Sequence, residues 1–205
     1  MKVAIFTLTR NRLSYTKRSF LSLQQRAGQR FEHHVVDNGS TDGTVDWLRD
    51  NERCFKSLTL LPENAGIPVA SNIALRRIRK SACDLIVKMD NDCMIETDAI
   101  LPKLTSAFLK LGFGSKCILS PHVAGVQHVP RFLCYSIGEH EIGVTGHVGG
   151  IFLAARSGMY RKYRYPEYLA KGRGSDSHVC MWMRRRGGLV GYVENLLVSH
   201  LTNIR

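Results

Sequence analysis

The chain has 205 residues, of which 44% are hydrophobic and 22% are charged, as in ordinary globular proteins rather than disordered ones. We predict a single domain over residues 1–205, because this length can bury a substantial core. No apolar run approaches a membrane span, and the apolar N-terminus is too short before Arg10 for a signal peptide. Six cysteines without a C-x-x-C pair fall mostly in apolar segments, so we expect reduced, buried thiols and a cytoplasmic protein without a zinc site.

Basic residues exceed acidic residues by 29 to 17, which gives a net charge of +12. Such a charge predicts attraction to an anionic partner, which can be a nucleotide, a nucleic acid or a membrane surface. A generally basic surface without a specific partner explains the same excess. The segment from Arg156 to Arg186 is the most basic, with nine Lys and Arg residues against Glu167 and Asp176.

The first half alternates apolar strand-like runs with helix-like segments. Strands are predicted at 3–8, 31–36, 57–61 and 85–89, and helices at 14–26, from 41–42 through 48, and at 67–79. This β-α-β-α-β-α-β pattern with short connections favours a doubly wound, mostly parallel sheet.

The second half is less regular. We expect a helix from 97–98 to 111 and a strand at 116–120 that Pro121 stops. The remaining expectations are short antiparallel strands within 122–146, a strand at 148–155, an irregular basic and aromatic loop at 163–173, a helix from 174–176 to 186, and extended pieces at 189–193 and 196–199.

Two carboxylates, Asp90 and Asp92, follow the apolar run 85–89. Open α/β sheets bind ligands beyond the carboxyl ends of their strands. Two close acidic groups repel each other unless a cation lies beside them, and hard divalent cations with nucleotide phosphates take such oxygen ligands. The pattern therefore indicates a metal–diphosphate site, although a solvated acidic turn would also produce it.

Six short motifs stand out along the chain: VVDNGSTDGT at 35–44, NAG at 64–66, DND at 90–92, GG at 149–150, SD at 175–176 and VSH at 198–200. Together they resemble the family-2 glycosyltransferases of the GT-A fold. Their order and spacing match over essentially the whole chain, with least support at 122–146. The resemblance implies a GT-A type α/β fold, with a Rossmann-like, doubly wound and mostly parallel central sheet and a smaller antiparallel acceptor-side region. Residues 1–96 would bind the nucleotide sugar and residues 97–205 the acceptor.

The resemblance also implies which residues hold the donor nucleotide. Asp37 would meet the base, with Gly39 allowing close backbone approach, although Asp37 also suits an Asx-turn. Ser71 stands where the family often has Arg, so we assign it no role. The implied nucleotide-binding residues are Thr7, Thr9, Arg12, Asp37, Asn64 and Asp90.

A divalent cation, Mn²⁺ or Mg²⁺, is implied by the same resemblance. Asp92 would ligate it, and His200 matches a late histidine that completes the metal shell. An imidazole ligand favours Mn²⁺ somewhat over Mg²⁺. A single histidine near the end of the chain can equally be incidental.

The family's inverting reaction requires a base that deprotonates the acceptor hydroxyl, and Asp176 matches that base. Ser175 replaces the usual first acid of the motif, and His178 replaces a following acid. Asp176 could otherwise be a helix N-cap. Gly149, Gly150 and His178 are the expected acceptor-side residues.

We therefore expect a metal-dependent, inverting hexosyl- or pentosyltransferase that moves one sugar from a nucleoside-diphosphate sugar, most simply a UDP-sugar, to a hydroxyl group. The Gln-x-x-Arg-Trp motif and membrane helices of processive synthases are missing, which favours single transfer. Four tyrosines, Tyr160, Tyr163, Tyr165 and Tyr168, are interleaved with basic residues, and their rings could stack on exposed bases. This combination suggests a polyanionic acceptor, either DNA or RNA with a hydroxylated base or an anionic lipid-linked glycan. Alternatively, the tyrosines pack inward and the arginines only keep the surface soluble.

Two alternatives belong to other classes. A nucleotidyltransferase would usually have a Gly-rich basic loop after the first strand, and residues 9–12 contain no glycine. A non-catalytic nucleic-acid-binding module would explain the charge of +12, but not three acidic residues at the ends of elements.

Overall fold

A computed structural model describes residues 1–112, 116–126, 129–169 and 174–201. The strands are β1 (Val3–Thr9), β2 (Phe31–Asn38), β3 (Ser57–Leu61), β4 (Leu85–Asp90), β5 (Cys93–Ile95), β6 (Cys117–Ala124), β7 (Leu133–Ile137), β8 (His140–Val144), β9 (Phe152–Arg156) and β10 (Leu189–His200). The helices are α1 (Leu13–Arg26), α2 (Thr44–Asp50), α3 (Ile67–Ile78), α4 (Ile100–Lys110), α5 (Ser157–Lys162) and α6 (Ser175–Arg184), with short 3-10 turns at Glu52–Cys54 and Glu167–Leu169.

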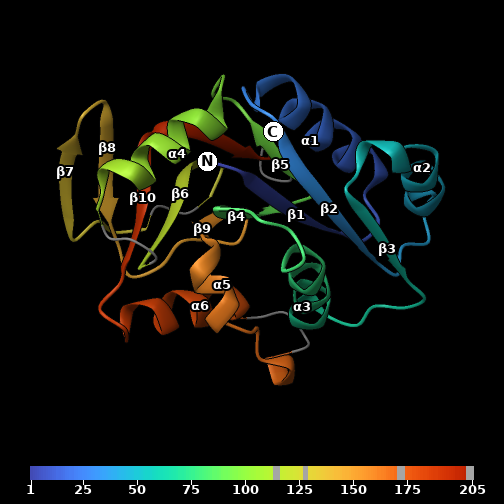
Figure 1. Cartoon of the computed structure of the whole chain (residues 1–205). Coiled ribbons are helices and arrows are strands. Elements are labelled where there is room, and N and C mark those ends of the chain that lie inside the picture. Colours follow the sequence, from blue (N-terminus) through green and yellow to red (C-terminus); the bar gives the residue numbers. More distant parts are fainter. Residues whose placement is uncertain (113–115, 127–128, 170–173, 202–205) are drawn as a thin grey trace.

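All described strands join one sheet in the order β3-β2-β1-β4-β9-β6-β10-β8-β7, with β5 paired to β10. Helices α1 and α4 cover one face, while α3, α5 and α6 cover the other (Figure 1). Both faces are therefore shielded from water, and this explains why the inner strands are apolar runs rather than alternating ones. The predicted α/β class and doubly wound arrangement are confirmed.

The first four strands, connected by α1, α2 and α3, form a parallel half-sheet. Strands β2 and β4 flank β1 in parallel, and β3 adds to β2 in parallel. The expected strand at 57–61 agrees with β3 at both ends, and β1, β2 and β4 extend one or two residues beyond their predicted ends. Because these strands are parallel, their carboxyl ends meet at one edge of the sheet.

The second half joins this sheet through β9, which runs antiparallel to both β4 and β6. Two expectations for this half are wrong. Pro121 does not stop β6, because β9 pairs only with Ile118 and Leu119, so the missing N–H of Pro121 faces an open edge. The two extended pieces at 189–193 and 196–199 form a single strand, β10, with an irregularity between Val193 and Leu197.

The predicted antiparallel region within 122–146 is present as the hairpin of β7 and β8, which pairs with the start of β10. The predicted strand at 148–155 begins later, at Phe152, so the two glycines at 149–150 lie in the turn before β9. This turn follows the hairpin and leads back into the centre of the sheet.

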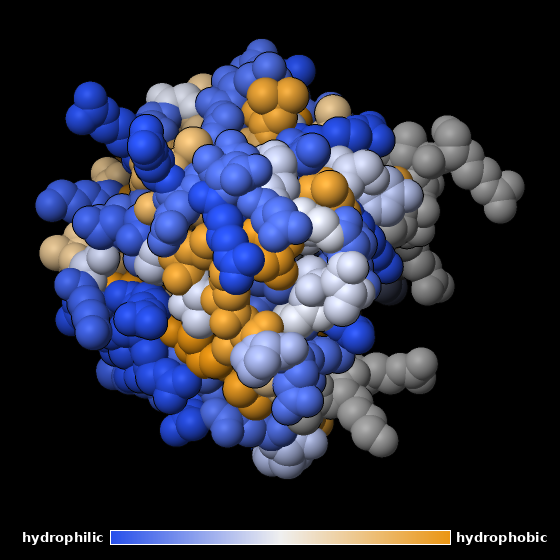
Figure 2. Space-filling view, turned by 90° about the vertical axis from the view of Figure 1, so that its right-hand side faces the viewer, coloured by the Kyte–Doolittle hydropathy of each residue, from blue (hydrophilic) through white to orange (hydrophobic). Residues whose placement is uncertain are grey.

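Two cysteines differ from expectation, since Cys54 and Cys134 are exposed while the other four are buried. All six are free thiols. Among the described helices none has the length and apolar character needed to cross a bilayer. A hydrophobic band crosses the side of the molecule that carries β3 and α2, between more hydrophilic areas (Figure 2).

Candidate active site

A cavity of about 550 Å³ opens at the carboxyl ends of β1, β2 and β4. This volume is in the usual range for small-molecule sites. Polar groups line most of it, with apolar surface from Leu8 and Ile67. The lining residues are Leu8, Thr9, Arg10, Asn11, Arg12, Asn38, Asn64, Gly66, Ile67, Asp90, Asn91 and Asp92.

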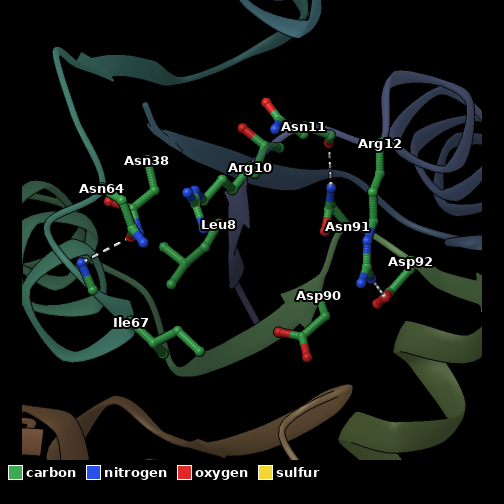
Figure 3. A pocket seen from close by; sticks show the side chains of 12 residues that line it. Leu8, Arg10, Asn11, Arg12, Asn38, Asn64, Ile67, Asp90, Asn91 and Asp92 are labelled. Atoms are coloured by element: carbon green, nitrogen blue, oxygen red, sulfur yellow. Dashed lines mark hydrogen bonds and ion pairs between the residues drawn. The ribbon is translucent and has the colours of Figure 1, made fainter. Parts of the chain in front are cut away.

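The cavity has two chemically different ends (Figure 3). Asn38 and Asn64 lie on one side, and Arg12 with Asp92 on the other, while Asp90 projects between them. Asn38 Nδ2 donates to Asn64 Oδ1 at 2.9 Å, and Asn38 Oδ1 accepts from the Ala65 N–H at 2.9 Å. These bonds fix the loop that leads from β3 into α3 against the end of β2.

Asp37 is fully buried beneath this end of the cavity and does not line it. Its Oδ2 accepts from Thr9 Oγ1 at 2.7 Å and from Ser40 Oγ at 2.5 Å. Its Oδ1 accepts from the Ser40 N–H, three residues further on, at 2.8 Å, so Asp37 stabilises the turn after β2, which is close to its alternative role as an Asx-turn residue. The neighbouring residue, Asn38, presents its amide to the cavity, and sequence reasoning missed it.

Thr7 also lies below the surface of the cavity. Its hydroxyl is 3.0 Å from His33 Nε2, and both side chains are buried between β1 and β2. Thr9, Arg12, Asn64 and Asp90 line the cavity, so four of the six expected nucleotide-binding residues are brought together there.

Arg12 pairs with Asp92 through Nη1 and Oδ2 at 2.6 Å. Arg12 has a left-handed backbone at the start of α1, with φ 61°, which turns its side chain from the β1 loop toward the end of β4. His200, the last residue of β10, places Nε2 3.3 Å from the same Asp92 oxygen. Residues distant in sequence thus meet at Asp92.

This arrangement fits a metal ion that arrives with a nucleotide. Two ligands about 2.1 Å from one cation at a right angle lie about 3.0 Å apart, close to the 3.3 Å between Asp92 Oδ2 and His200 Nε2. In the described part of the chain no three His, Cys, Asp or Glu side chains gather around one point. Mg²⁺ and Mn²⁺ commonly take the remaining ligands from substrate phosphates and water. The half-exposed Arg12 side chain can leave Asp92 when a cation binds.

A buried lysine connects this cavity to Asp176. Lys88 Nζ donates to Asp90 Oδ1 at 2.7 Å and to the Gly150 carbonyl at 2.8 Å, and it lies 3.7 Å from Asp176 Oδ1. Burial alone would lower the pKa of Lys88, but Asp176 and Asp90 outweigh burial and raise the pKa above its ordinary value. Lys88 is therefore a buried ammonium held among acidic partners.

Gly150 shapes the space around this ammonium. A Cβ added there would overlap both oxygens of Asp176 and would stand 2.5 Å from Lys88 Nζ. At Gly149 a Cβ would meet no atom within 4 Å, so the two glycines, expected to act alike, differ. Asp176 lies in the first turn of α6, and Gly174 rather than Asp176 occupies the N-cap position. The alternative role as an N-cap is therefore not observed.

His178 follows Asp176 on α6, and its Nδ1 lies 3.0 Å from the Tyr163 hydroxyl. The expectation that four interleaved tyrosines present rings for stacking is wrong for three of them. Tyr160, Tyr163 and Tyr165 are buried between α5, α6 and the sheet, and only Tyr168 of the four is exposed. Their apolar rings complete the core below Asp176. Lys171 and Arg173 of the expected basic loop lie outside the described residues.

Sequence reasoning overlooked Lys88 because it read 85–89 as a buried apolar run. A signal was available, since a lysine two residues before Asp90 in a strand shares a face with it.

The family model "Glycosyl transferase family 2" matches residues 4–126. The chain is 34% identical over 102 residues to YfnE, an uncharacterized glycosyltransferase of Bacillus subtilis (strain 168). This match covers 49% of this chain and 25% of that protein. The chain thus spans a quarter of the length of this curated relative.

Solved structures of low sequence identity share the fold. S. aureus TarS (1-349) matches with a TM-score of 0.72 at 18% identity, over 97% of this chain and 60% of that one. The mannosyltransferase PcManGT of Pyrobaculum calidifontis, solved with GDP-Man and Mn²⁺, matches with a TM-score of 0.72 at 19% identity, over 100% of this chain and 58% of that one. The family match covers more than half of the sequence, and the cavity lies where a GT-A fold ends its parallel strands, so the chain belongs to glycosyltransferase family 2.

Proposed function

We propose that this chain transfers a single sugar from a nucleoside-diphosphate sugar to an acceptor hydroxyl, with inversion at the anomeric carbon and with a divalent metal. The observation that carries the proposal is the cavity itself, which joins amide groups, apolar surface and two carboxylates at the strand ends. TarS has been solved with UDP-GlcNAc and PcManGT with GDP-Man, which supports a nucleotide-sugar donor for this chain.

The donor would lie across the cavity from the amide end to the carboxylate end. Asn38 and Asn64 offer hydrogen-bonding groups for a base, and Leu8 and Ile67 offer apolar surface. Asp90 would accept from the ribose hydroxyls at the middle of the cavity. Arg12 would neutralise the diphosphate, because a guanidinium matches phosphate oxygens well. Thr7 and Asp37 would support this site from below.

A divalent cation, Mn²⁺ or Mg²⁺, would be held by Asp92 and His200, where it would offset negative charge on the departing nucleoside diphosphate. Arg12 would then move from Asp92 to the phosphates. This exchange keeps the carboxylate neutralised in both states.

Asp176 would act as the base on the acceptor side. It would take the proton of the acceptor hydroxyl while that oxygen bonds to the anomeric carbon and the bond from that carbon to the diphosphate oxygen breaks. The proton ends on Asp176, and the electron pair leaves with the nucleoside diphosphate. Gly150 leaves room beside Asp176, and Gly149 and His178 would contact the acceptor.

The acceptor, or its carrier, would be anionic. The basic side chains of Arg161, Lys162 and Arg164 are exposed next to the buried tyrosines. Arg164 also forms an ion pair with Glu167, with 2.6 Å between Nη2 and Oε1. Binding to DNA and to anionic vesicles over a salt series separates the two candidate acceptors. Tight, steeply salt-dependent DNA binding supports a nucleic acid as the acceptor, and vesicle binding supports a lipid-linked glycan. If the protein binds neither DNA nor vesicles at low salt, that result contradicts an anionic acceptor.

The donor half is tested by the thermal shift that UDP- and GDP-sugars cause with and without Mn²⁺. One nucleotide class should raise the melting temperature only with the metal, and Asp90→Asn should remove that increase. Equal shifts in the Asp90→Asn protein would contradict the assignment of this cavity, and no shift with any nucleotide sugar would contradict the proposed function.

A further inference from the structure

Lys88 is the one lysine among the largest side chains that are buried in the described part of the chain, and it lies in the middle of β4. Its neighbours along the strand, Val87 and Met89, are also fully buried. A buried ammonium is costly unless charged or polar partners surround it. Its presence here therefore needs an explanation that packing alone does not give.

The partners of Lys88 come from three separate elements. Asp90 belongs to the end of β4, Gly150 to the turn before β9, and Asp176 to the first turn of α6. Nζ is 2.7 Å from Asp90 Oδ1 and 2.8 Å from the Gly150 carbonyl, so two of its three N–H donors are used. The third can point to Asp176 Oδ1, 3.7 Å away.

Asp176 has a carboxylate oxygen that lacks a hydrogen-bond donor, whereas Lys88 has an N–H group to donate. Its Oδ1 is buried and makes no hydrogen bond, and its side chain is only 30% exposed. Gly174 occupies the N-cap position of α6, so the Asp176 carboxylate is not used as the N-cap of the helix. The ammonium of Lys88 is the cationic group that the structure records within ion-pair distance of it.

We propose that Lys88 is a positioning residue, which holds the carboxylate of Asp176 toward the donor cavity through the contact it shares with Asp90. This inference rests on the proposed function, in which Asp90 holds the donor and Asp176 takes the acceptor proton. One ammonium then links the donor side to the acceptor side of the site. The absent side chain at Gly150 leaves room for this contact, because a Cβ there would force the carboxylate of Asp176 and the ammonium of Lys88 to shift.

A double-mutant cycle tests this role. Lys88→Met keeps an unbranched chain of similar length but removes the charge, and Asp176→Asn removes the proton acceptor. Lys88→Met should lower kcat by about 100-fold, as loss of a base does. In the Asp176→Asn background it should lower kcat by no more than about twofold, the usual limit of additivity error. Equal losses in both backgrounds would overturn the proposal.

A purely structural lysine would give other results. Lys88→Arg keeps the charge and should recover part of the lost kcat with the donor KM close to that of the unaltered protein. Gly150→Ala, which leaves Lys88 and Asp176 in the sequence, should lower kcat in the same way as Lys88→Met. Lys103→Met, an exposed lysine on α4, is the matched control and should leave kcat unchanged. Full kcat in Lys88→Met would also overturn the proposal.

The same four proteins of the cycle separate this inference from the proposed function. Their unfolding midpoints in urea report the coupling of Lys88 and Asp176 without any turnover. If the midpoint change of the double variant equals the sum of the changes of the two single variants, Lys88 and Asp176 do not interact, and the proposal is wrong even if the enzyme is active. If the changes are not additive but the protein transfers no sugar, the contact is supported and the proposed function is wrong. If Lys88→Met does not fold, Gly150→Ala and Lys88→Arg provide the kcat comparison.

Discussion

Arg12 Nη1 lies 2.6 Å from Asp92 Oδ2, so the second carboxylate of the DND motif is paired with a cation from the chain itself. Asp92 is nearly buried, whereas the Arg12 side chain is half-exposed and can move. In the proposed function, a divalent metal and Arg12 would therefore compete for the same oxygen. The first prediction follows from this competition.

Arg12→Gln should tighten the binding of Mn²⁺ to the free protein and weaken the binding of a nucleoside diphosphate. The first effect arises because Asp92 loses its competing cation, and the second because the diphosphate loses a guanidinium partner worth about 1.5–3 kcal/mol. Titration with Mn²⁺ followed by electron paramagnetic resonance measures the metal, and calorimetry measures the nucleotide.

Arg30→Gln, at an exposed position outside the cavity, is the control and should change neither affinity. Asp92→Asn should abolish metal-dependent nucleotide binding. Unchanged Mn²⁺ affinity in Arg12→Gln would show that Asp92 is not the metal ligand.

Asp37 and Asn38 are adjacent, and we expect them to affect different properties. Asp37→Asn should lower the free energy of unfolding by about 1–3 kcal/mol, because a buried network with Thr9 and Ser40 loses an acceptor. Asn38→Ala should instead weaken nucleotide binding, since this amide faces the cavity. Urea unfolding and calorimetry on both variants measure the two effects. If Asn38→Ala binds the nucleotide with unchanged affinity, while Asp37→Asn folds normally and loses affinity, nucleotide binding would be assigned to Asp37 instead.

His33 should make the protein less stable in mild acid. Burial, with a smaller effect from His34, lowers the pKa of His33 from 6.5 to about 3. Between these values the unfolded state binds a proton that the folded state does not, so the free energy of unfolding falls as the pH drops from 6.5 toward 3. The slope from this one group approaches about 1.4 kcal/mol per pH unit.

Urea unfolding at a series of pH values measures this slope. His33→Gln can still bond to Thr7 but cannot titrate, so its stability should depend less steeply on pH. His34, whose pKa burial also lowers, leaves a residual slope in both proteins. Identical slopes would exclude His33 as the source.

The first half of the fold could be read from the sequence because each strand there carries apolar residues and is followed by turn residues and a helix-like segment. The second half could not, since its order depends on pairings between distant segments. The antiparallel insertion of β9 between β4 and β6 has no local signal. Pro121 illustrates this point, because only the short reach of β9 along β6 makes it tolerable inside a strand.

The site divides in the same way. The sequence motifs predicted a common site for Arg12, Asn64, Asp90 and Asp92, and all four line the cavity. It could not decide between Asp37 and Asn38, because which of two neighbours faces the cavity depends on the turn at Ser40. Nor could it reveal that Lys88 reaches Asp176, a contact between residues far apart in the chain.

The most direct test of the whole account measures the release of nucleoside diphosphate from the nucleotide sugar that binds best. With Mn²⁺, the unaltered protein should release it slowly to water and faster once an acceptor is present. Asp176→Asn should bind the donor with the same affinity and lower the rate by about 100-fold or more, and EDTA should stop release in both proteins. Equal rates for the two proteins, undiminished by EDTA, would contradict a metal-dependent transferase with Asp176 as its base.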